Sequence, residues 1–264
     1  MHRFFLPPEL ARNPVIFLTG REAHHAMHVL RLRHADQVAV LDGAGQQLEA
    51  EVFSVDRDRV GLKVLSRIPG PALPCQVTLL QALPKGKLIE SIVQKATELG
   101  VFRIVPLLSE RVVRQLDADQ AVREADKLHT VAVEAIKQCG CPWLPKVDLP
   151  MTIEGFLSRG EHYELPLVAS LQEHSRHPRD WFRSYIDNHS RLPKSICVWI
   201  GPEGDFTPTE LKSIEESGAL PITLGPFILR TETAAIYSLS VINYEAQLLS
   251  RATFGISPQD PAIE

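Results

Sequence analysis

The chain has 264 residues and a net charge of -4, with 44% hydrophobic and 23% charged residues. This composition excludes a disordered chain and predicts one large or two modest folded domains. The acidic balance argues against a protein that coats nucleic acid without selectivity, because such proteins bind mainly by neutralising phosphates. Residues 1–74 are nevertheless slightly basic, with nine Lys/Arg against eight Asp/Glu, and hold five of the ten histidines.

Targeting signals and disulfide patterns are missing from the sequence. No apolar run reaches the roughly 20 residues of a membrane helix, and residues 1–14 lack the apolar stretch and cleavage site of a signal peptide. The four cysteines have no C-x-x-C spacing and are too few for a disulfide framework. We therefore expect a cytoplasmic protein with reduced thiols, no membrane association and no metal.

The first 70 residues alternate short apolar segments with turns, which predicts a small β-barrel. Asp42-Gly43-Ala44-Gly45 is a hairpin signal, and a helix is predicted from Thr19 or Gly20 to Leu30. The strands are expected over residues 15–18, 37–41, 48–55 and 59–65.

The segment 68–74 holds three prolines and a glycine, and the character of the sequence changes across it. We predict domains over residues 1–72 and 73–264. Strands in the second domain are expected over 77–80, 104–108, 167–170, 195–200 and 221–224, and helices include 86–99, 118–138 and 231–251. This alternation predicts an α/β fold with a mostly parallel sheet covered on both faces.

Two strand ends in this domain carry the best candidate site. In the segment 198–208 a buried strand runs into a glycine- and proline-containing loop and then into a helix capped by Thr207. The segment 224–234 repeats this order and carries Arg230 just before the final helix. Ligands collect at the carboxyl ends of strands in open α/β sheets, and glycine lets backbone groups approach a ligand closely. The pair of turns therefore predicts a small-molecule site.

Several common chemistries lose their sequence support. The chain has no P-loop, no G-x-G-x-x-G after a strand, no G-x-S-x-G elbow and no H-E-x-x-H helix. These absences argue against nucleoside triphosphate hydrolysis, Rossmann dinucleotide binding, serine hydrolysis and zinc proteolysis.

Four stretches together resemble the ribosomal RNA small-subunit methyltransferase E family, the uracil-N3 methyltransferases of the SPOUT superfamily. They occur in the family's order and span nearly the whole chain. They are HHAMHVLRLR at 24–33, QALPKGK at 81–87 with QKATELGV at 94–101, IGPEG at 200–204, and LG at 224–225 with ILRTETA at 228–234.

The resemblance implies a C-terminal SPOUT methyltransferase domain with a deep trefoil knot, which is a rare exception to unknotted topology, and an N-terminal PUA-like β-barrel that binds RNA. It implies a homodimer, S-adenosylmethionine as cofactor with S-adenosylhomocysteine as product, and 16S ribosomal RNA within the small ribosomal subunit as partner. The cofactor-binding residues that it implies are Leu171, Ile200, Gly201, Pro202, Glu203, Gly204, Leu224, Gly225, Ile228, Leu229, Arg230, Thr231 and Ala234.

The implied reaction removes a proton from uracil N3 and aligns that nitrogen with a methyl donor. A cation beside the developing uracil anion lowers the pKa of N3 and stabilises the transition state. Arg230 is the expected cation, and Glu203 or Glu232 is the expected proton acceptor or orienting group. Two alternatives stay open, because Glu232 can instead stabilise a helix N-terminus and Glu203 can instead fix its own loop.

The expected RNA-binding residues are His24, His25, Arg31, Arg33, Lys85 and Lys87. Because N3 lies on the Watson-Crick edge, the target uridine must be unpaired or flipped into the site. A solvated helix end is the alternative for the two arginines. His24 and His28 are four residues apart and could share a metal, but no third ligand is in view.

Three positions depart from the family pattern. Asp205 stands where a second glycine is usual, Phe227 where a basic residue is more common, and Lys137 reverses a charge. Two other functions stay open: a noncatalytic RNA-binding or ribosome-assembly factor with the same fold, and a related transfer RNA methyltransferase.

Overall fold

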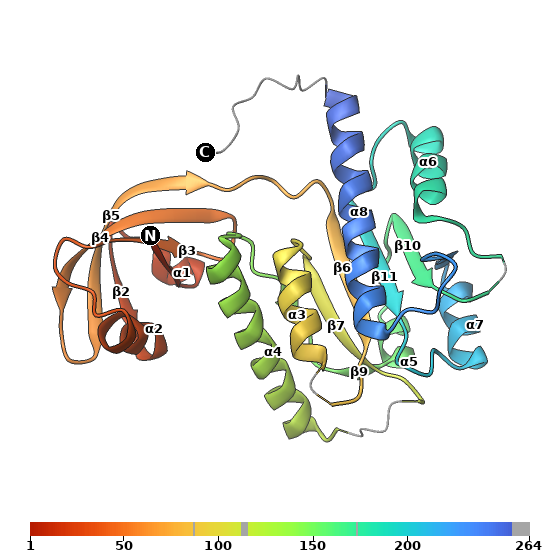
Figure 1. The fold of residues 1–264 in the computed structure, drawn as a ribbon, viewed down its shortest axis with the longest axis horizontal. Helices are drawn as coiled ribbons and strands as arrows, with labels where there is room; N and C mark the ends of the chain where they lie inside the picture. Colours follow the sequence, from red (N-terminus) through yellow and green to blue (C-terminus); the bar gives the residue numbers. More distant parts are fainter. Residues whose placement is uncertain (87, 112–115, 173, 255–264) are drawn as a thin grey trace. The chain divides into compact units, whose positions relative to one another are not determined.

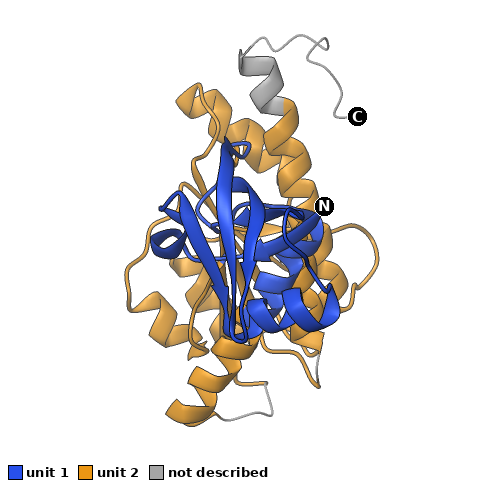
Figure 2. Cartoon of the chain, turned by 90° about the vertical axis from the view of Figure 1, so that its left-hand side faces the viewer, with its two compact units in different colours: residues 1–72, 130–145 blue, residues 73–129, 146–264 orange. Residues whose placement is uncertain are grey.

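The structure is a computed structural model that describes residues 1–86, 88–111, 116–172 and 174–254, with side chains up to residue 248 (Figure 1). Lys87, one of the expected RNA-binding residues, lies outside the described residues. Two compact units are present: unit 1 comprises residues 1–72 and 130–145, and unit 2 comprises residues 73–129 and 146–264 (Figure 2). The break at residue 72 falls in the proline-rich segment, and residues 130–145 group with the N-terminal residues.

Unit 1 is built on a five-stranded sheet. Its order is β1 (His2–Phe5), β3 (Gln37–Leu41), β4 (Gln46–Val55), β5 (Arg59–Pro69) and β2 (Val15–Thr19). Strand β1 runs parallel to β3, and the other neighbours are antiparallel. Alternate residues of β2 are buried, as a sheet with one face on a core requires. The four predicted strands are confirmed, while β1 was not predicted because its partner is distant in sequence.

The predicted hairpin joins β3 to β4. The buried Asp42 carboxylate accepts hydrogen bonds from the backbone N–H groups of Ala44 at 2.8 Å and Gln46 at 2.9 Å. Gly43 and Gly45 have positive φ angles of 74° and 98°, a conformation that glycine adopts without steric cost. The glycines therefore allow the backbone conformation of the turn, and the Asp42 carboxylate accepts hydrogen bonds from its backbone N–H groups.

The predicted histidine-containing helix is present in two parts. Helix α2 (Gly20–His24) continues into a π-helix, η1 (His25–Val29). The left-handed backbone of Arg31, with φ of 55°, ends the helical stretch. Ala23 and Ala26 face the unit 1 core, so the histidines between and after them are turned outward or half-buried. The short helix α1 (Pro8–Ala11) precedes β2.

Unit 2 contains a sheet in which every pairing is parallel, which confirms the predicted α/β fold. Its main strand order is β12 (Leu220–Ile222), β10 (Leu165–Ala169), β11 (Ser195–Ile200), β6 (Gln76–Ala82), β7 (Arg103–Leu108) and β8 (Lys146–Val147). The short strand β9 (Met151–Thr152) also pairs with β7.

Helices cover both faces of this sheet, as near-continuous burial of β6 and β11 requires. Helices α5 (Ile153–Leu157) and α7 (Pro208–Glu216) pack on the face that carries Trp199. The ring of Phe156 meets the Trp199 ring edge-on, with centroids 5.3 Å apart. Helices α3 (Leu88–Glu98), α6 (Pro178–His189) and α8 (Thr231–Phe254) form the other layer, in which α8 contacts α3, α6 and β11 (Figure 1).

Helix α4 (Ala118–Cys139) is divided between the two units at residue 130. None of the helices among the described residues combines the length and apolar character needed to cross a membrane. In unit 2, the parallel pairing brings the carboxyl ends of β10, β11 and β12 to one edge of the sheet. The loops that follow these three strands therefore meet.

Candidate functional site

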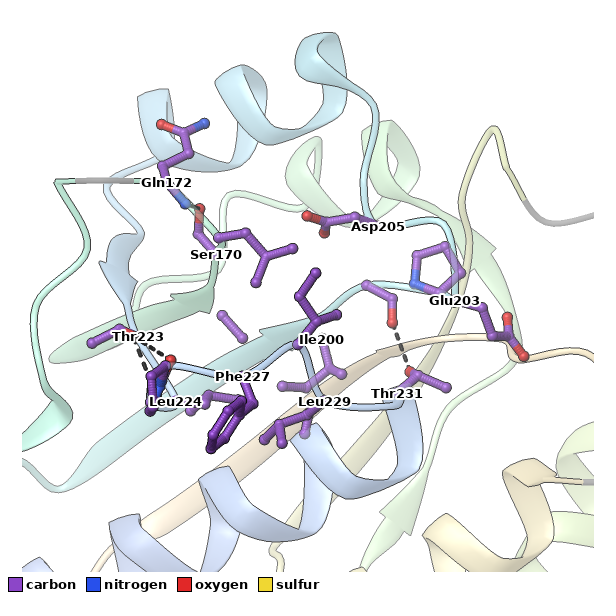
Figure 3. A pocket seen from close by; sticks show the side chains of 18 residues that line it. Ser170, Gln172, Ile200, Glu203, Asp205, Thr223, Leu224, Phe227, Leu229 and Thr231 are labelled. Atoms are coloured by element: carbon purple, nitrogen blue, oxygen red, sulfur yellow. Dashed lines mark hydrogen bonds between the residues drawn. The ribbon is translucent and has the colours of Figure 1, made fainter.

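A cavity of about 370 Å³ lies at this edge of the unit 2 sheet (Figure 3). Such a volume is in the range of small-molecule sites. Three loops line the cavity, one after each of β10, β11 and β12, together with the first turn of α8. The lining residues are Ala169, Ser170, Leu171, Gln172, Ile200, Gly201, Pro202, Glu203, Asp205, Thr223, Leu224, Gly225, Pro226, Phe227, Ile228, Leu229, Thr231 and Ala234.

The structure brings together most of the residues expected to bind a cofactor. Eleven of those thirteen residues line the cavity, and Gly204 and Arg230 do not. The segment 169–172 supplies a wall of the cavity, and Leu171 is its one residue that the family resemblance implies. That segment has no glycine or proline to mark it, and its place depends on β10 lying between β11 and β12.

Thr231 connects two of the cavity loops. Its hydroxyl donates to the backbone carbonyl of Gly201 at 2.6 Å and accepts from Nε2 of Gln81 at 3.0 Å. The same Gln81 amide donates to the carbonyl of Ala82 at 2.9 Å. The carbonyls of Gly201 and Ala82 can only accept hydrogen bonds. They therefore fix the donor and the acceptor of each hydrogen bond in this series.

Gln81 is fully buried at the carboxyl end of β6, and sequence reasoning did not assign it a site role. Its Oε1 atom has no hydrogen-bond partner among the described residues. A buried unpaired amide oxygen lowers stability, so the residue is not explained by packing alone. A polar side chain is needed at this position because its Nε2 atom donates to the Ala82 carbonyl and to the Thr231 hydroxyl.

Glu203 ties the loop after β11 to the loop after β6. Its Oε1 atom accepts from the backbone N–H of Lys85 at 2.9 Å, and its carboxylate is drawn turned away from the cavity (Figure 3). The guanidinium of Arg111 donates to the carbonyl of Gly204. This geometry favours the alternative in which Glu203 fixes loops, because its carboxylate already has a backbone partner.

The predicted cap of α7 is confirmed. The Thr207 hydroxyl accepts from the backbone N–H of Glu210 at 3.2 Å, and the Glu210 carboxylate accepts from the backbone N–H of Thr207 at 2.8 Å. Glu210 also accepts from the backbone N–H of Glu110 at 2.7 Å. The cap therefore fixes the end of the cavity loop and anchors the segment after β7.

Asp205 lines the cavity in an unusual backbone conformation. Its φ is 62°, in the left-handed region, and its Oδ1 atom accepts from the backbone N–H of Phe206 at 2.8 Å. A Cβ atom at residue 201 would lie 2.8 Å from Oδ1 of Asp205, so a side chain there would displace this carboxylate. Figure 3 shows the Asp205 carboxylate directed toward the side of the cavity formed by Ser170 and Gln172.

The two other expected catalytic residues flank the start of α8. Arg230 is exposed and immediately precedes the helix, and its carbonyl accepts from the N–H of Ala234 at 2.8 Å. Glu232 lies in the first turn of α8 and is half-buried. A carboxylate there interacts favourably with the helix dipole, so both roles considered for Glu232 remain compatible with its position.

A second cavity, of about 340 Å³, lies within unit 1. His24 and His25 line it with Arg21, Glu22, Val29, Glu134 and Lys137. The buried ammonium of Lys137 forms ion pairs with Glu22 at 2.8 Å and Glu134 at 3.2 Å. The reversed charge at residue 137 is therefore neutralised inside the same unit.

Three further expected RNA-binding residues among the described residues are accessible. Arg31 and Arg33 are exposed after η1, and Lys85 is exposed in the loop after β6. The rings of His24 and His28 lie 4.7 Å apart by their centroids. Across the described ranges, no three or more His, Cys, Asp or Glu side chains are grouped so that they could hold a metal ion.

Comparisons with known proteins identify the family. Residues 71–243 match the model of an RNA methyltransferase domain, and residues 18–65 match that of an RNA methyltransferase PUA domain. The chain is 32% identical to the ribosomal RNA small subunit methyltransferase E of Bacillus subtilis, over 94% of this chain and 98% of that protein.

Two solved structures with bound cofactor are similar over most of the chain. A methyltransferase of Legionella pneumophila in complex with the cofactor SAM has a TM-score of 0.82 and 29% identity, covering 92% of this chain and 96% of that one. The ribosomal RNA small subunit methyltransferase E of Neisseria gonorrhoeae, bound to S-adenosyl methionine, has a TM-score of 0.79 and 26% identity, covering 92% and 97%. The chain belongs to the family of ribosomal RNA small subunit methyltransferase E.

Proposed function

We propose that this chain uses S-adenosylmethionine to methylate N3 of a specific uridine in 16S ribosomal RNA. The observation that carries the proposal is the unit 2 cavity, where loops from three neighbouring strands and the start of α8 close around one small-molecule volume. Family membership and the cofactor bound to two similar proteins support the identity of the ligand.

The residues of the cavity fit this cofactor. Backbone groups of the loops after β11 and β12 offer donors and acceptors for an adenine edge, because Gly201 and Gly225 leave their backbone uncovered. Leu171, Phe227 and Ile228 are 64%, 78% and 81% exposed and offer apolar surface for the purine and the thioether region. When bound, the cofactor supplies an electrophilic methyl group.

The protein side of the reaction is positioning and charge. Holding the uracil nitrogen in line with the donor converts a bimolecular encounter into a unimolecular step. Arg230, exposed beside the cavity, is the cation that stabilises the developing uracil anion. Of the two carboxylates, Glu232 is the proton acceptor or orienting group that we favour, because Glu203 already binds the backbone N–H of Lys85.

Unit 1 is the RNA-reading part in this proposal. His24 and His25 line its cavity, and Arg31 and Arg33 lie exposed on the same segment. Arginine side chains contact phosphates and orient an RNA chain. Lys85 and Lys87 would contact RNA from unit 2, and the target base would be flipped into the site.

The proposal includes a deep trefoil knot in unit 2 and a two-fold homodimer. Exposed apolar side chains support the dimer, since large exposed apolar residues beside a site often mark an interface. They include Leu171, Phe227 and Ile228 at the cavity and Tyr237, Tyr244 and Leu248 on α8. The small ribosomal subunit is the proposed partner, which places the protein in the cytoplasm.

The direct test is modified-nucleoside analysis. Purified protein and labelled cofactor are incubated in three separate reactions, with unmodified small subunits, with naked 16S RNA and with transfer RNA. We expect 3-methyluridine in 16S RNA. Label only in transfer RNA would support the related transfer RNA enzyme. RNA binding without cofactor binding in calorimetry would support a noncatalytic assembly factor.

A further inference from the structure

Asp205 holds a backbone conformation that most residues avoid. It is one of four non-glycine residues with positive φ in the part of the chain that the structure describes, with Arg31, Ala35 and Ser190, and of these it alone lines the unit 2 cavity. Aspartate tolerates this region better than most side chains, but glycine adopts it freely. Strained residues cluster at functional sites, so the side chain needs an explanation.

Local hydrogen bonding holds the carboxylate in place. Its Oδ1 atom accepts from the N–H of Phe206 at 2.8 Å, and the missing side chain of Gly201 leaves room for that oxygen. The carboxylate is thereby fixed at the cavity wall, directed toward Ser170 and Gln172 (Figure 3). A negative charge at a fixed point in a cavity acts on the charge of whatever the cavity holds.

The charge of the cavity lining has one sign. Its residues include two carboxylates, Asp205 and Glu203, and no lysine or arginine. Glu203 is turned away and already accepts from a backbone N–H, which leaves Asp205 as the charge that faces the cavity (Figure 3). S-adenosylmethionine carries a net positive charge through its sulfonium, whereas S-adenosylhomocysteine lacks the sulfonium and is neutral.

We propose that Asp205 is a specificity-determining residue, whose carboxylate makes the cavity favour the sulfonium cofactor over the neutral product. The inference rests on the proposed function. The negative charge of Asp205 attracts the positively charged methyl donor. Once the methyl group has been transferred, the ligand has lost its sulfonium charge and this attraction ends. Product is thereby displaced more readily by fresh cofactor.

Two variants of Asp205 separate the effect of its charge from the effect of its backbone conformation. Asp205→Asn keeps the side-chain oxygen that accepts from Phe206 and tolerates positive φ, so it removes only the charge. Asp205→Gly removes the side chain and relieves the backbone. Glu216→Gln removes an exposed carboxylate on α7, outside the cavity, and is the matched control.

The experiment measures dissociation constants by calorimetry for the full chain, wild type and variants. The ligands are S-adenosylmethionine, S-adenosylhomocysteine and an analogue in which an amine-bearing carbon replaces the sulfonium and carries its positive charge. We expect the preference for S-adenosylmethionine over S-adenosylhomocysteine to fall by up to about five-fold in both Asp205 variants, the scale of one solvent-screened pair of opposite charges. The charged analogue should follow S-adenosylmethionine, and Glu216→Gln should leave the ratio unchanged.

An unchanged ratio in Asp205→Asn would overturn the inference while leaving the proposed function intact. If the ratio falls in Asp205→Gly and not in Asp205→Asn, the effect belongs to the backbone and not to the charge. If the wild type binds none of the three ligands, the proposed function itself fails, and the inference fails with it. Thermal melting of each variant checks folding. If Asp205→Asn does not fold, the charged analogue keeps the test, because in Asp205→Gly it must lose affinity together with S-adenosylmethionine while S-adenosylhomocysteine does not.

Discussion

The hydroxyl of Thr231 donates a hydrogen bond of 2.6 Å to the carbonyl of Gly201, joining residues 30 positions apart. This contact ties the first residue of α8 to the loop after β11, and Gln81 holds the hydroxyl from the other side. The distance between the loop after β11 and the loop before α8 therefore depends on one buried hydroxyl. The spacing of residues in the sequence does not predict this contact.

Thr231→Val should weaken cofactor binding about ten-fold, because it leaves the Gly201 carbonyl without the hydroxyl donor and the Gln81 amide with the Ala82 carbonyl as its remaining acceptor. Calorimetry with S-adenosylmethionine measures the change. Thr97→Val is the matched control, since the buried Thr97 hydroxyl donates to the carbonyl of Val93 within α3, away from the cavity. Equal losses of affinity in both variants would show a general effect of destabilisation.

Gln81→Met should separate affinity from stability. The substitution removes the Nε2 donor to Thr231 but also removes the unpaired Oε1 atom. Removing an unsatisfied buried oxygen offsets the lost hydrogen bonds, so the free energy of unfolding should change by less than about 1 kcal/mol while cofactor affinity falls several-fold. Urea unfolding and calorimetry on the same preparation measure both. A large loss of stability with unchanged affinity would contradict the positioning role.

Arg230→Ala should lower kcat at least about 100-fold, the scale of losing one key electrostatic donor. Because Arg230 does not line the cavity, the dissociation constant of S-adenosylmethionine should change by less than about three-fold, since an exposed charge contributes little to binding. Methyl transfer to RNA under saturating cofactor gives kcat. Near-normal turnover would remove Arg230 from the mechanism.

Lys137→Met should destabilise unit 1, because it removes the ammonium that pairs with the largely buried Glu22 carboxylate. Loss of one partner from a buried pair costs on the order of 3 kcal/mol. Urea unfolding of Lys137→Met, Glu22→Gln and the double variant forms a thermodynamic cycle. The double variant should be more stable than Lys137→Met alone; a purely additive cycle would show that the pair does not couple.

The carboxylate of Glu164 gives a pH signature. Hydrogen bonds from Arg191, and one from the N–H of Lys194, lower the pKa of Glu164 from its usual 4.5 to about 2, against the opposing effect of burial. A depressed pKa in the folded state stabilises the fold above the ordinary pKa and loses that contribution as pH falls toward the folded value. Glu164→Gln should therefore be less stable than wild type at pH 6. The gap in urea midpoint should narrow steadily between pH 4.5 and pH 2, and a constant gap would contradict this linkage.

Local patterns predicted most of the fold. The apolar runs at Gln37–Leu41 and Ser195–Ile200 match strands β3 and β11 residue for residue, and the Thr207 cap marks the start of α7. These features depend on neighbours within a few residues, which the sequence displays directly. Strand β1 and the π-helix η1 were missed, because a parallel partner far along the chain and a change of helical pitch leave no local pattern.

The sequence by itself determined the family, the α/β order and the two glycine-proline turns, because spacing and residue type carry that information. Only the tertiary structure decided that the segment after β10 completes the cavity, that Gln81 reaches Thr231 across 150 residues, and that Arg230 stands outside the cavity. The reason is physical: a parallel sheet sets which strand ends meet through its strand order, and side-chain direction at a loop follows from φ angles such as that of Asp205.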